Sequence, residues 1–148
     1  MNVLAIDFGL KRIGMAVGST ESGIAFAREV LRNDENLFDR IAGITDPEDV
    51  KRIIVGMPFK RDGSVGDIDQ ELQEFILALE HKTSIPVELA DERYTSKIAQ
   101  SKLRELGVKE KAMKTKIDAM SAQVILQDWL DKNQFLLLLL AQVLFDFN

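Results

Sequence analysis

The sequence contains no cysteine, so it can form neither a disulfide nor a thiolate metal site, which is typical of proteins from a reducing compartment. It also lacks a basic N-terminal segment followed by an apolar stretch and a cleavage site, so no secretory signal is indicated. No apolar run is long enough to span a bilayer. We therefore expect a cytoplasmic protein with no membrane partner.

The sequence also contains only one histidine, and its net charge is negative. The single histidine, His81, ends an amphipathic segment, where a surface position is expected, and Ser19 and Thr20 have no base partner in the pattern. Nucleophilic serine chemistry is therefore unsupported. The formal net charge of −5 argues against a protein that coats nucleic acid through bulk electrostatics.

The basic residues that are present gather in a few short stretches. Taken singly, each is most simply a solvated surface residue, but their grouping also suits phosphate groups. The grouped cations are Lys11, Arg12, Lys60, Arg61, Lys109, Lys111, Lys114 and Lys116.

The 148 residues, 46% of them hydrophobic, are enough for one domain with a substantial core. Apolar periodicity predicts three meander strands followed by two strand–helix units and a final helical region. This order predicts an α/β fold with a mixed five-stranded sheet and helices on both faces. The expected strands are 3–7, 13–18, 23–31, 52–57 and 85–90, and the expected helices are 36–44, 68–79, 96–107 and 117–130.

The last stretch, FLLLLLAQVLFDFN over residues 135–148, has an unusual composition for this chain. It is too short to span a membrane as a single helix and lacks an amphipathic period. We expect a final helix or edge strand packed on the core, with a partner-binding tail as the alternative.

Three acidic residues stand out because apolar neighbours surround them. Asp7 ends the strand VLAI, Glu92 follows the strand IPVELA together with Asp91, and Asp118 begins the helical face that continues through Ala122. Strand ends in such a sheet can lie close together, and clustered carboxylates repel one another unless a cation binds. Oxygen-only ligands favour Mg²⁺ or Mn²⁺.

Each of these acids also has an ordinary explanation. Asp7 could cap its own turn, Glu92 could pair with Arg93 at the surface, and Asp118 could be a favourable acid in the first turn of a helix. Their coincidence at strand ends and on one helix face favours a metal site.

Four segments together resemble the YqgF family. They are AIDFGLKRIGMAV, IIVGMPFKRDGS, VELADERYTS and KIDAMSAQVILQDWL, and they span about residues 1–130 in the family's order. The resemblance implies a ribonuclease H-like fold in a nuclease domain over residues 1–132, followed by an apolar tail over 133–148. Family members are described as Holliday junction resolvases and as nucleases that mature the 5′ end of 16S ribosomal RNA. Leu10 and Tyr94 depart from the family pattern, and neither change removes a carboxylate.

The resemblance also implies a mechanism. Asp7, Glu92 and Asp118 would be both catalytic residues and ligands of two Mg²⁺ or Mn²⁺ ions about 3.5–4 Å apart, which activate a water and stabilise the leaving oxygen. Nucleic-acid phosphates would be held by Lys11, Arg12, Lys60, Arg93, Lys109, Lys111, Lys114 and Lys116.

Two other functions remain open at this point. A nucleotide phosphotransferase of the actin and sugar-kinase type also begins with D-x-G after a strand, although it needs two lobes. A non-catalytic nucleic-acid-binding module would gain nothing from clustered acids. The sequence does not separate RNA from branched DNA as substrate. Symmetric cutting of a junction would require a homodimer, for which residues 136–145 are a candidate interface.

Overall fold

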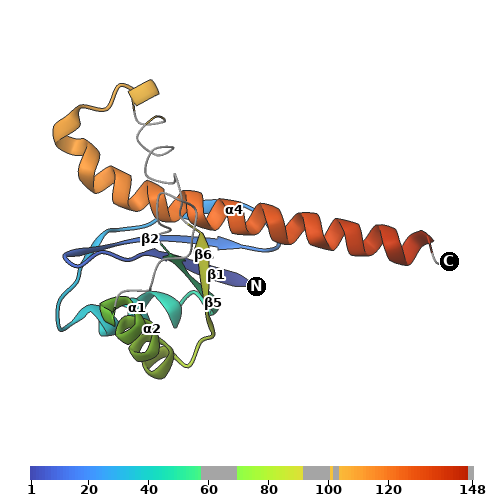
Figure 1. The fold of residues 1–148 in the computed structure, drawn as a ribbon, viewed down its shortest axis with the longest axis horizontal. Coiled ribbons are helices and arrows are strands. Elements are labelled where there is room, and N and C mark those ends of the chain that lie inside the picture. The colour runs from blue at the N-terminus through green and yellow to red at the C-terminus, as the bar shows by residue number, and fades with distance from the viewer. Residues whose placement is uncertain (58–69, 92–100, 102–103, 147–148) are drawn as a thin grey trace.

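The computed structural model describes residues 1–57, 70–91, 101 and 104–146, and the side chains of residues 57, 91 and 110–119 lie outside this description. A mixed sheet forms the centre of the domain, with helices on both of its faces, as Figure 1 shows. The predicted fold class is thus confirmed. The strands are β1 (Asn2–Asp7), β2 (Arg12–Ser19), β3 (Ala25–Ala27), β4 (Leu31–Arg32), β5 (Val50–Met57) and β6 (Val87–Asp91), and the helices are α1 (Leu37–Thr45), α2 (Gln70–Thr83) and α4 (Glu110–Asp146).

The sheet runs in the order β3-β2-β1-β5-β6, and β4 pairs with the beginning of β2. The pairs β1–β2 and β2–β3 are antiparallel, whereas β1–β5 and β5–β6 are parallel. The described part of the sheet has six strands rather than the predicted five. The reason is that the predicted strand 23–31 divides: β3 pairs with residues 16–18 of β2, and β4 pairs with residues 12–13.

Strand β1 is apolar from Val3 to Ile6 because this part lies in the middle of the sheet with both faces covered. Leu4 and Ile6 join the hydrophobic cluster under α1 and α2, and Val3 and Ala5 join the cluster under α4. All four side chains are fully buried. Alternate residues of β1 therefore serve two separate halves of the core.

Helix α4 packs closely on its face of the sheet because small residues meet there. Ala5, Ala16, Ala25 and Ala122 are all buried in the cluster that it forms with the sheet. Gln127 of α4 accepts a hydrogen bond from the Ala25 N–H at 3.0 Å and donates one to the Gly23 carbonyl at 2.8 Å, so it also satisfies backbone groups at the sheet edge.

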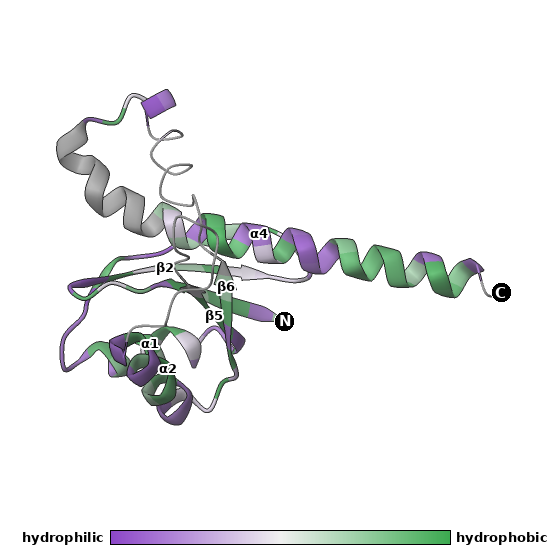
Figure 2. Cartoon of the chain, viewed as in Figure 1, coloured by the Kyte–Doolittle hydropathy of each residue, from purple (hydrophilic) through white to green (hydrophobic). Residues whose placement is uncertain are grey.

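The expectation that the apolar C-terminal stretch packs on the core is wrong. Residues 135–146 continue α4 without a break and project beyond the sheet, as Figures 1 and 2 show. Leu130 is the last buried residue of the helix, and the side chains from Phe135 to Leu140 are 47–64% exposed. The physical reason is that residues 122–130 already cover this face of the sheet, which leaves the later turns no surface to contact.

Two further points concern the helices. The predicted helix 96–107 lies mostly outside the described residues, but Gly107 has a φ of +77°, which fits its predicted role in ending that helix. Within the described parts of the chain, no helix combines the length and the apolar character needed to cross a membrane.

Candidate functional site

Asp7 is the last residue of the central strand β1 and is half-buried. Because side chains alternate along a strand, Asp7 belongs to the same face as Val3 and Ala5, which is the face covered by α4. Phe8 lies on the opposite face, where its ring contacts that of Phe75 in α2 at a centroid distance of 4.8 Å. This aromatic contact anchors the chain directly after Asp7 and so fixes which way the carboxylate is presented.

The parallel strands bring a second acidic segment to the same edge of the sheet. Ile6 of β1 is level with Val55 of β5, and Val55 is level with Leu89 of β6. The carboxyl ends of β1 and β6 therefore lie at one edge, roughly 10 Å apart across β5. Asp91 ends β6, and Glu92 follows it directly in the chain. Glu92 itself lies outside the described residues, as does the Asp91 side chain.

Helix α4 carries the third predicted acid past the same face. The backbone of Asp118 is helical, and its side chain lies outside the description. Ala122 and Ile125, four and seven residues later, are buried against the sheet. Ser121 is 1% exposed, and its Oγ has no hydrogen-bond partner among the described residues. An oxygen donor is thus available one turn from Asp118.

The donor chemistry of these residues suits a hard divalent cation. The three predicted ligands offer carboxylate oxygens only, which are the ligands that Mg²⁺ and Mn²⁺ prefer. Among the side chains that the structure describes, no group of three or more His, Cys, Asp or Glu residues could hold a metal ion. Only Asp7 of the three ligands belongs to those side chains, so the ligand set stays a prediction.

The loop after Asp7 is held in place by Asn33, a residue that sequence reasoning missed. The Asn33 Nδ2 donates to the Gly9 carbonyl at 2.9 Å, and the Asn33 N–H donates to the Lys11 carbonyl at 2.8 Å. Leu10 and Lys11, which follow Gly9 in this loop, are exposed beside the acidic site. Nothing local in the sequence pairs Asn33 with this loop, because the contact depends on β4 lying beside β2.

The predicted phosphate-binding residues are placed only in part. Lys11 and Lys109 are exposed, and Arg12 is half-buried at the start of β2, opposite the end of β1. Lys60 and Arg93 lie outside the described residues. The last three cations lie on the first turns of α4, and their side chains are outside the description; they are Lys111, Lys114 and Lys116.

Sequence reasoning also missed two arginines next to Arg12. Arg32 of β4 is directly opposite Arg12, and Arg40 of α1 lies nearby, so the three line one groove of about 470 Å³. Arg40 forms an ion pair and hydrogen bond with Asp34, which together with the Asn36 N–H holds the pKa of that carboxyl below its usual value. These arginines could not be found from spacing, because only the strand register brings them together.

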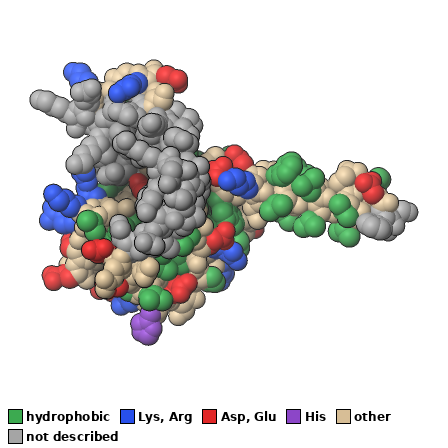
Figure 3. All heavy atoms as spheres, viewed as in Figure 1, with side chains coloured by type: hydrophobic (Ala, Val, Ile, Leu, Met, Phe, Trp, Pro, Cys, Tyr) green, Lys and Arg blue, Asp and Glu red, His purple; other side chains and the backbone are tan. Residues whose placement is uncertain are grey.

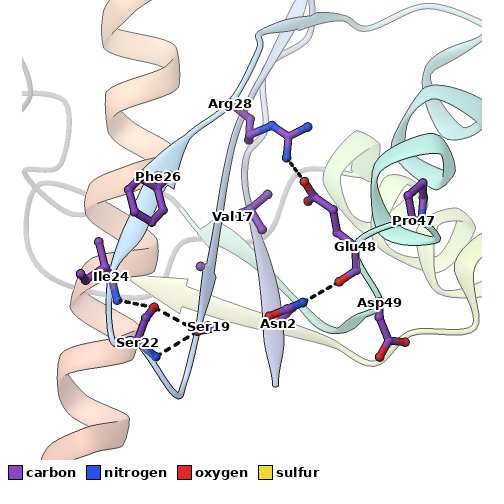
Figure 4. A pocket seen from close by; sticks show the side chains of 11 residues that line it. Asn2, Val17, Ser19, Ser22, Ile24, Phe26, Arg28, Pro47, Glu48 and Asp49 are labelled. Atoms are coloured by element: carbon purple, nitrogen blue, oxygen red, sulfur yellow. Dashed lines mark hydrogen bonds and ion pairs between the residues drawn. The ribbon is translucent and has the colours of Figure 1, made fainter.

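A larger groove lies at the other end of the sheet, shown in Figure 4. It has a volume of about 560 Å³ and lies between β3 and the turn before β5. The Asn2 amide donates to the Glu48 carbonyl at 2.6 Å, and Arg28 pairs with Oε1 of the Glu48 carboxylate, whose Oε2 has no hydrogen-bond partner among the described residues. Since β1 begins here and ends at Asp7, this groove is separate from the acidic site.

Comparison with protein families matches residues 1–132 to the family described as "RuvX: Holliday junction resolvase". A protein of Maridesulfovibrio salexigens named "Putative pre-16S rRNA nuclease" is 33% identical over 132 residues, which cover 88% of this chain and 98% of that protein. A protein of the same name from Nitrosomonas europaea is 38% identical over 133 residues, covering 87% of this chain and 88% of the relative.

Solved structures resemble the chain in fold. Thermus thermophilus RuvC in complex with a Holliday junction substrate has a TM-score of 0.55 at 15% identity, covering 90% of this chain and 96% of that one. The fowlpox virus resolvase with Holliday junction DNA has a TM-score of 0.51 at 13% identity, covering 89% and 98%. At such low identity the likeness concerns the fold, and it confirms the expected ribonuclease H-like architecture.

Proposed function

Since this chain belongs to the RuvX family, we propose that it is a hydrolase that cleaves phosphodiester bonds in nucleic acid. The observation that carries the proposal is the position of Asp7: a half-buried carboxylate at the end of the central strand, on the face that α4 covers. Burial of a carboxylate costs free energy that hydrogen bonds or opposite charges must offset, and a bound cation would supply such a charge. The domain that performs this chemistry would be residues 1–132, the part that the family matches.

Asp7, Glu92 and Asp118 would hold Mg²⁺ or Mn²⁺ through carboxylate oxygens. When bound, the metal supplies Lewis-acid stabilisation of the scissile phosphate and a more acidic water. Asp7 is held firmly by its neighbours, because Ile6 is fully buried before it and the Phe8–Phe75 ring contact follows it. A rigid ligand of this kind keeps the geometry of the site constant through the reaction.

The basic residues would hold the phosphate backbone. Lys11 and Arg12 flank the Asp7 loop and would bind phosphates next to the bond that is cut, which orients the substrate without reading its bases. Further along, Lys109 and the lysines at the beginning of α4 would bind more distant phosphates, and Lys60 and Arg93 complete the proposed set. In a chain of net charge −5, these local cations supply the attraction.

For the substrate, the proposal favours a structured ribosomal RNA precursor cut at the 5′ side of 16S RNA. The relatives at 33–38% identity carry that name, whereas the solved structures that contain Holliday junctions are 13–15% identical. Four-way DNA junctions are the second candidate, because the family's description names them. A junction resolvase would also need two active sites in one assembly.

The test offers the purified chain two labelled substrates, a 16S precursor RNA and a four-way DNA junction, with Mg²⁺, with Mn²⁺ or with EDTA. We expect metal-dependent cleavage that is lost in Asp7→Asn. The matched control is Asp49→Asn, an exposed aspartate before β5, at the opposite end of the sheet from Asp7. Its φ of +51° suits asparagine as well as aspartate, so the control should keep full activity.

The outcomes separate the competing functions. Binding of either nucleic acid without cleavage under any metal condition would indicate a binding module and contradict the hydrolase. Equal cleavage by the unmodified chain and Asp7→Asn would contradict the proposed site. Hydrolysis of ATP in place of nucleic acid would support the phosphotransferase alternative.

A further inference from the structure

The groove of three arginines is positively charged, although the chain as a whole is negative. Arg12, Arg32 and Arg40 line it together with one carboxylate, Asp34, so its formal charge is +2 by these four groups, in a chain of net charge −5. Guanidinium groups match phosphate oxygens in a planar, bidentate geometry and are weakly hydrated. The groove is therefore a local exception that favours anions.

The strand register adds a second argument. Arg12 and Arg32 occupy directly opposite positions on β2 and β4. The next pair, Ile13 and Leu31, packs toward α1 and α2, and Leu31 lines the groove together with Arg40 of α1, so the groove lies where β2 begins, beside α1. Like charges in opposite positions of a sheet are unfavourable, and a phosphate bound beside Arg32 would offset part of this cost.

The groove also lies at a useful distance from Asp7. Asp7 is level with Gly14, two residues from Arg12 on the neighbouring strand, and β4 is one strand further. Strand spacing and rise place the two arginine Cα atoms roughly 8–12 Å from that of Asp7. The arginines are therefore within reach of phosphates close to the bond that is cut.

We propose that this groove binds the sugar–phosphate backbone of the nucleic-acid substrate on one side of the cleavage site, with Arg32 as its central positioning residue. The proposal rests on the proposed nuclease function and adds the path of the substrate across β4. Because the contacts are to phosphates, they hold RNA and DNA alike and leave base sequence unread.

The test measures binding by fluorescence anisotropy in the Asp7→Asn background, with Mg²⁺ present, for the precursor RNA and the four-way junction. Arg32→Gln should weaken both affinities roughly 3- to 10-fold and lower the salt slope by about one. Asp34→Asn removes the one carboxylate of the groove and should tighten both affinities. The charge-matched control is Lys51→Gln, an exposed cation near the start of β5, which should stay within about twofold.

An effect of Arg32→Gln no larger than that of Lys51→Gln, with an unchanged salt slope, would overturn the groove. Failure of the groove is distinguishable from failure of the nuclease, because cleavage by the unmodified chain is measured separately. A chain that cleaves while Arg32→Gln binds normally refutes only the groove. A chain that neither binds nor cleaves either substrate refutes both.

The projecting end of α4 carries a second, independent inference. Nine large apolar side chains between Phe135 and Phe145 are 47–77% exposed. In Figure 2 most of the helix beyond the sheet has the colour of hydrophobic residues, and in Figure 3 groups of hydrophobic side chains lie along this part of the helix. Six consecutive apolar residues, 135–140, occupy more than one full turn, so the surface extends around the helix.

The size of this surface matches a subunit contact. The exposed apolar area is on the order of 1,000 Å², above the roughly 300–600 Å² of the largest patch on a typical monomer. Each partner in a stable complex contributes about 800 Å². Residues 133–146 contain no lysine or arginine, which anionic lipid surfaces require, and a helix of 12 residues is about 18 Å long, well short of a bilayer.

We propose that residues 135–145 bind the same segment of a second copy as an antiparallel helix pair. A two-fold axis makes one apolar helix complementary to itself. The antiparallel arrangement also keeps the two domains at opposite ends of the pair, which limits the repulsion between two chains that each have a net charge of −5.

Sedimentation equilibrium of the full chain tests this pairing. We expect a concentration-dependent dimer that Leu140→Glu converts to a monomer. The matched control, Leu77→Glu on α2, replaces a leucine of similar exposure (67% against 60%) and should leave the dimer intact. A monomeric unmodified chain would overturn the proposal. So would flotation of the chain with neutral phosphatidylcholine vesicles that Leu140→Glu abolishes, since the surface would then serve a lipid bilayer.

Discussion

Gly9 is the residue on which the turn after Asp7 depends. A Cβ at this position would lie 2.5 Å from the Arg12 carbonyl oxygen, a backbone atom that cannot move aside cheaply. We expect Gly9→Ala to destabilise the fold by about 1–3 kcal/mol and to lower nucleic-acid cleavage more than tenfold. Urea unfolding and single-turnover cleavage would measure the two effects.

The control for that change is Gly43→Ala. A Cβ at Gly43, inside α1, has no heavy atom within 4 Å, so alanine should stabilise the helix by about 0.5–1 kcal/mol. If Gly9→Ala left the free energy of unfolding unchanged or raised it as Gly43→Ala should, the tight turn at Gly9 would be refuted.

The ion pair between Asp34 and Arg40 leads to a prediction about the pKa of the Asp34 carboxyl. Its pKa is lowered, first by the hydrogen bond from Arg40 and then by that from the Asn36 N–H. A carboxyl whose folded pKa is depressed stabilises the fold above its unfolded pKa, and this contribution is lost as pH falls through the folded pKa. Carboxyl-carbon NMR titration should therefore find the Asp34 pKa raised toward its ordinary value in Arg40→Gln. An unchanged pKa would contradict the ion pair.

A single site residue could be predicted from the sequence where its neighbours along the chain show that it is partly buried. Asp7 could be predicted as a candidate because VLAI precedes it and a glycine-bearing turn follows. Arg32 and Asn33 could not, since both act through the pairing of β4 with β2, and no local pattern encodes which strands pair.

At the scale of the element, α4 combines two environments in one helix. Leu126 is fully buried against the sheet, and Leu136, ten residues later, is 58% exposed. We expect Leu126→Ala to cost about 2–5 kcal/mol of unfolding free energy, because it leaves a cavity under the helix. Leu136→Ala should cost far less, since alanine also has the higher helix propensity.

Denaturant unfolding at low protein concentration compares the two variants. A large loss for Leu136→Ala in a monomeric sample would mean that the projecting turns contact the domain. Equal, small effects would mean that α4 does not cover the sheet as described.

Helix length was the least predictable property of the elements. Periodicity predicted α4 from residue 117 to 130, whereas the helix runs from Glu110 to Asp146. The apolar stretch has no period because no single face of it is buried within one chain. Hydrophobic periodicity indicates burial only where polar and apolar residues alternate. A run of leucines has the same hydropathy pattern whether the helix is exposed or buried.

For the whole molecule, the order of strands and helices sufficed to predict the fold class, since three meander strands and two strand–helix units leave few topologies. Whether Glu92 and the Asp118 side chain join Asp7 remains a prediction, because both lie outside the described part of the structure. The homodimer that the sequence suggests, with residues 136–145 as its candidate interface, likewise stays a prediction, since it depends on what the projecting helix contacts.

The charge distribution of the molecule predicts a modest salt dependence. Binding through a few local cations, on a chain of net charge −5, should give a log–log slope of affinity against salt of about −2 to −4. Anisotropy titrations at several salt concentrations between about 50 and 200 mM would measure this slope. A slope near zero would contradict phosphate binding by the groove, and a much steeper slope would require a basic surface far larger than this one.

We propose Asp7 as the main ligand of a divalent-cation site, and calorimetric titration with Mn²⁺ in the absence of nucleic acid measures this role without substrate binding or chemistry. We expect the unmodified chain and Asp49→Asn to bind Mn²⁺, and Asp7→Asn to bind it at least about tenfold more weakly. Equal affinities in Asp7→Asn and the unmodified chain, or no Mn²⁺ binding by either, would contradict it.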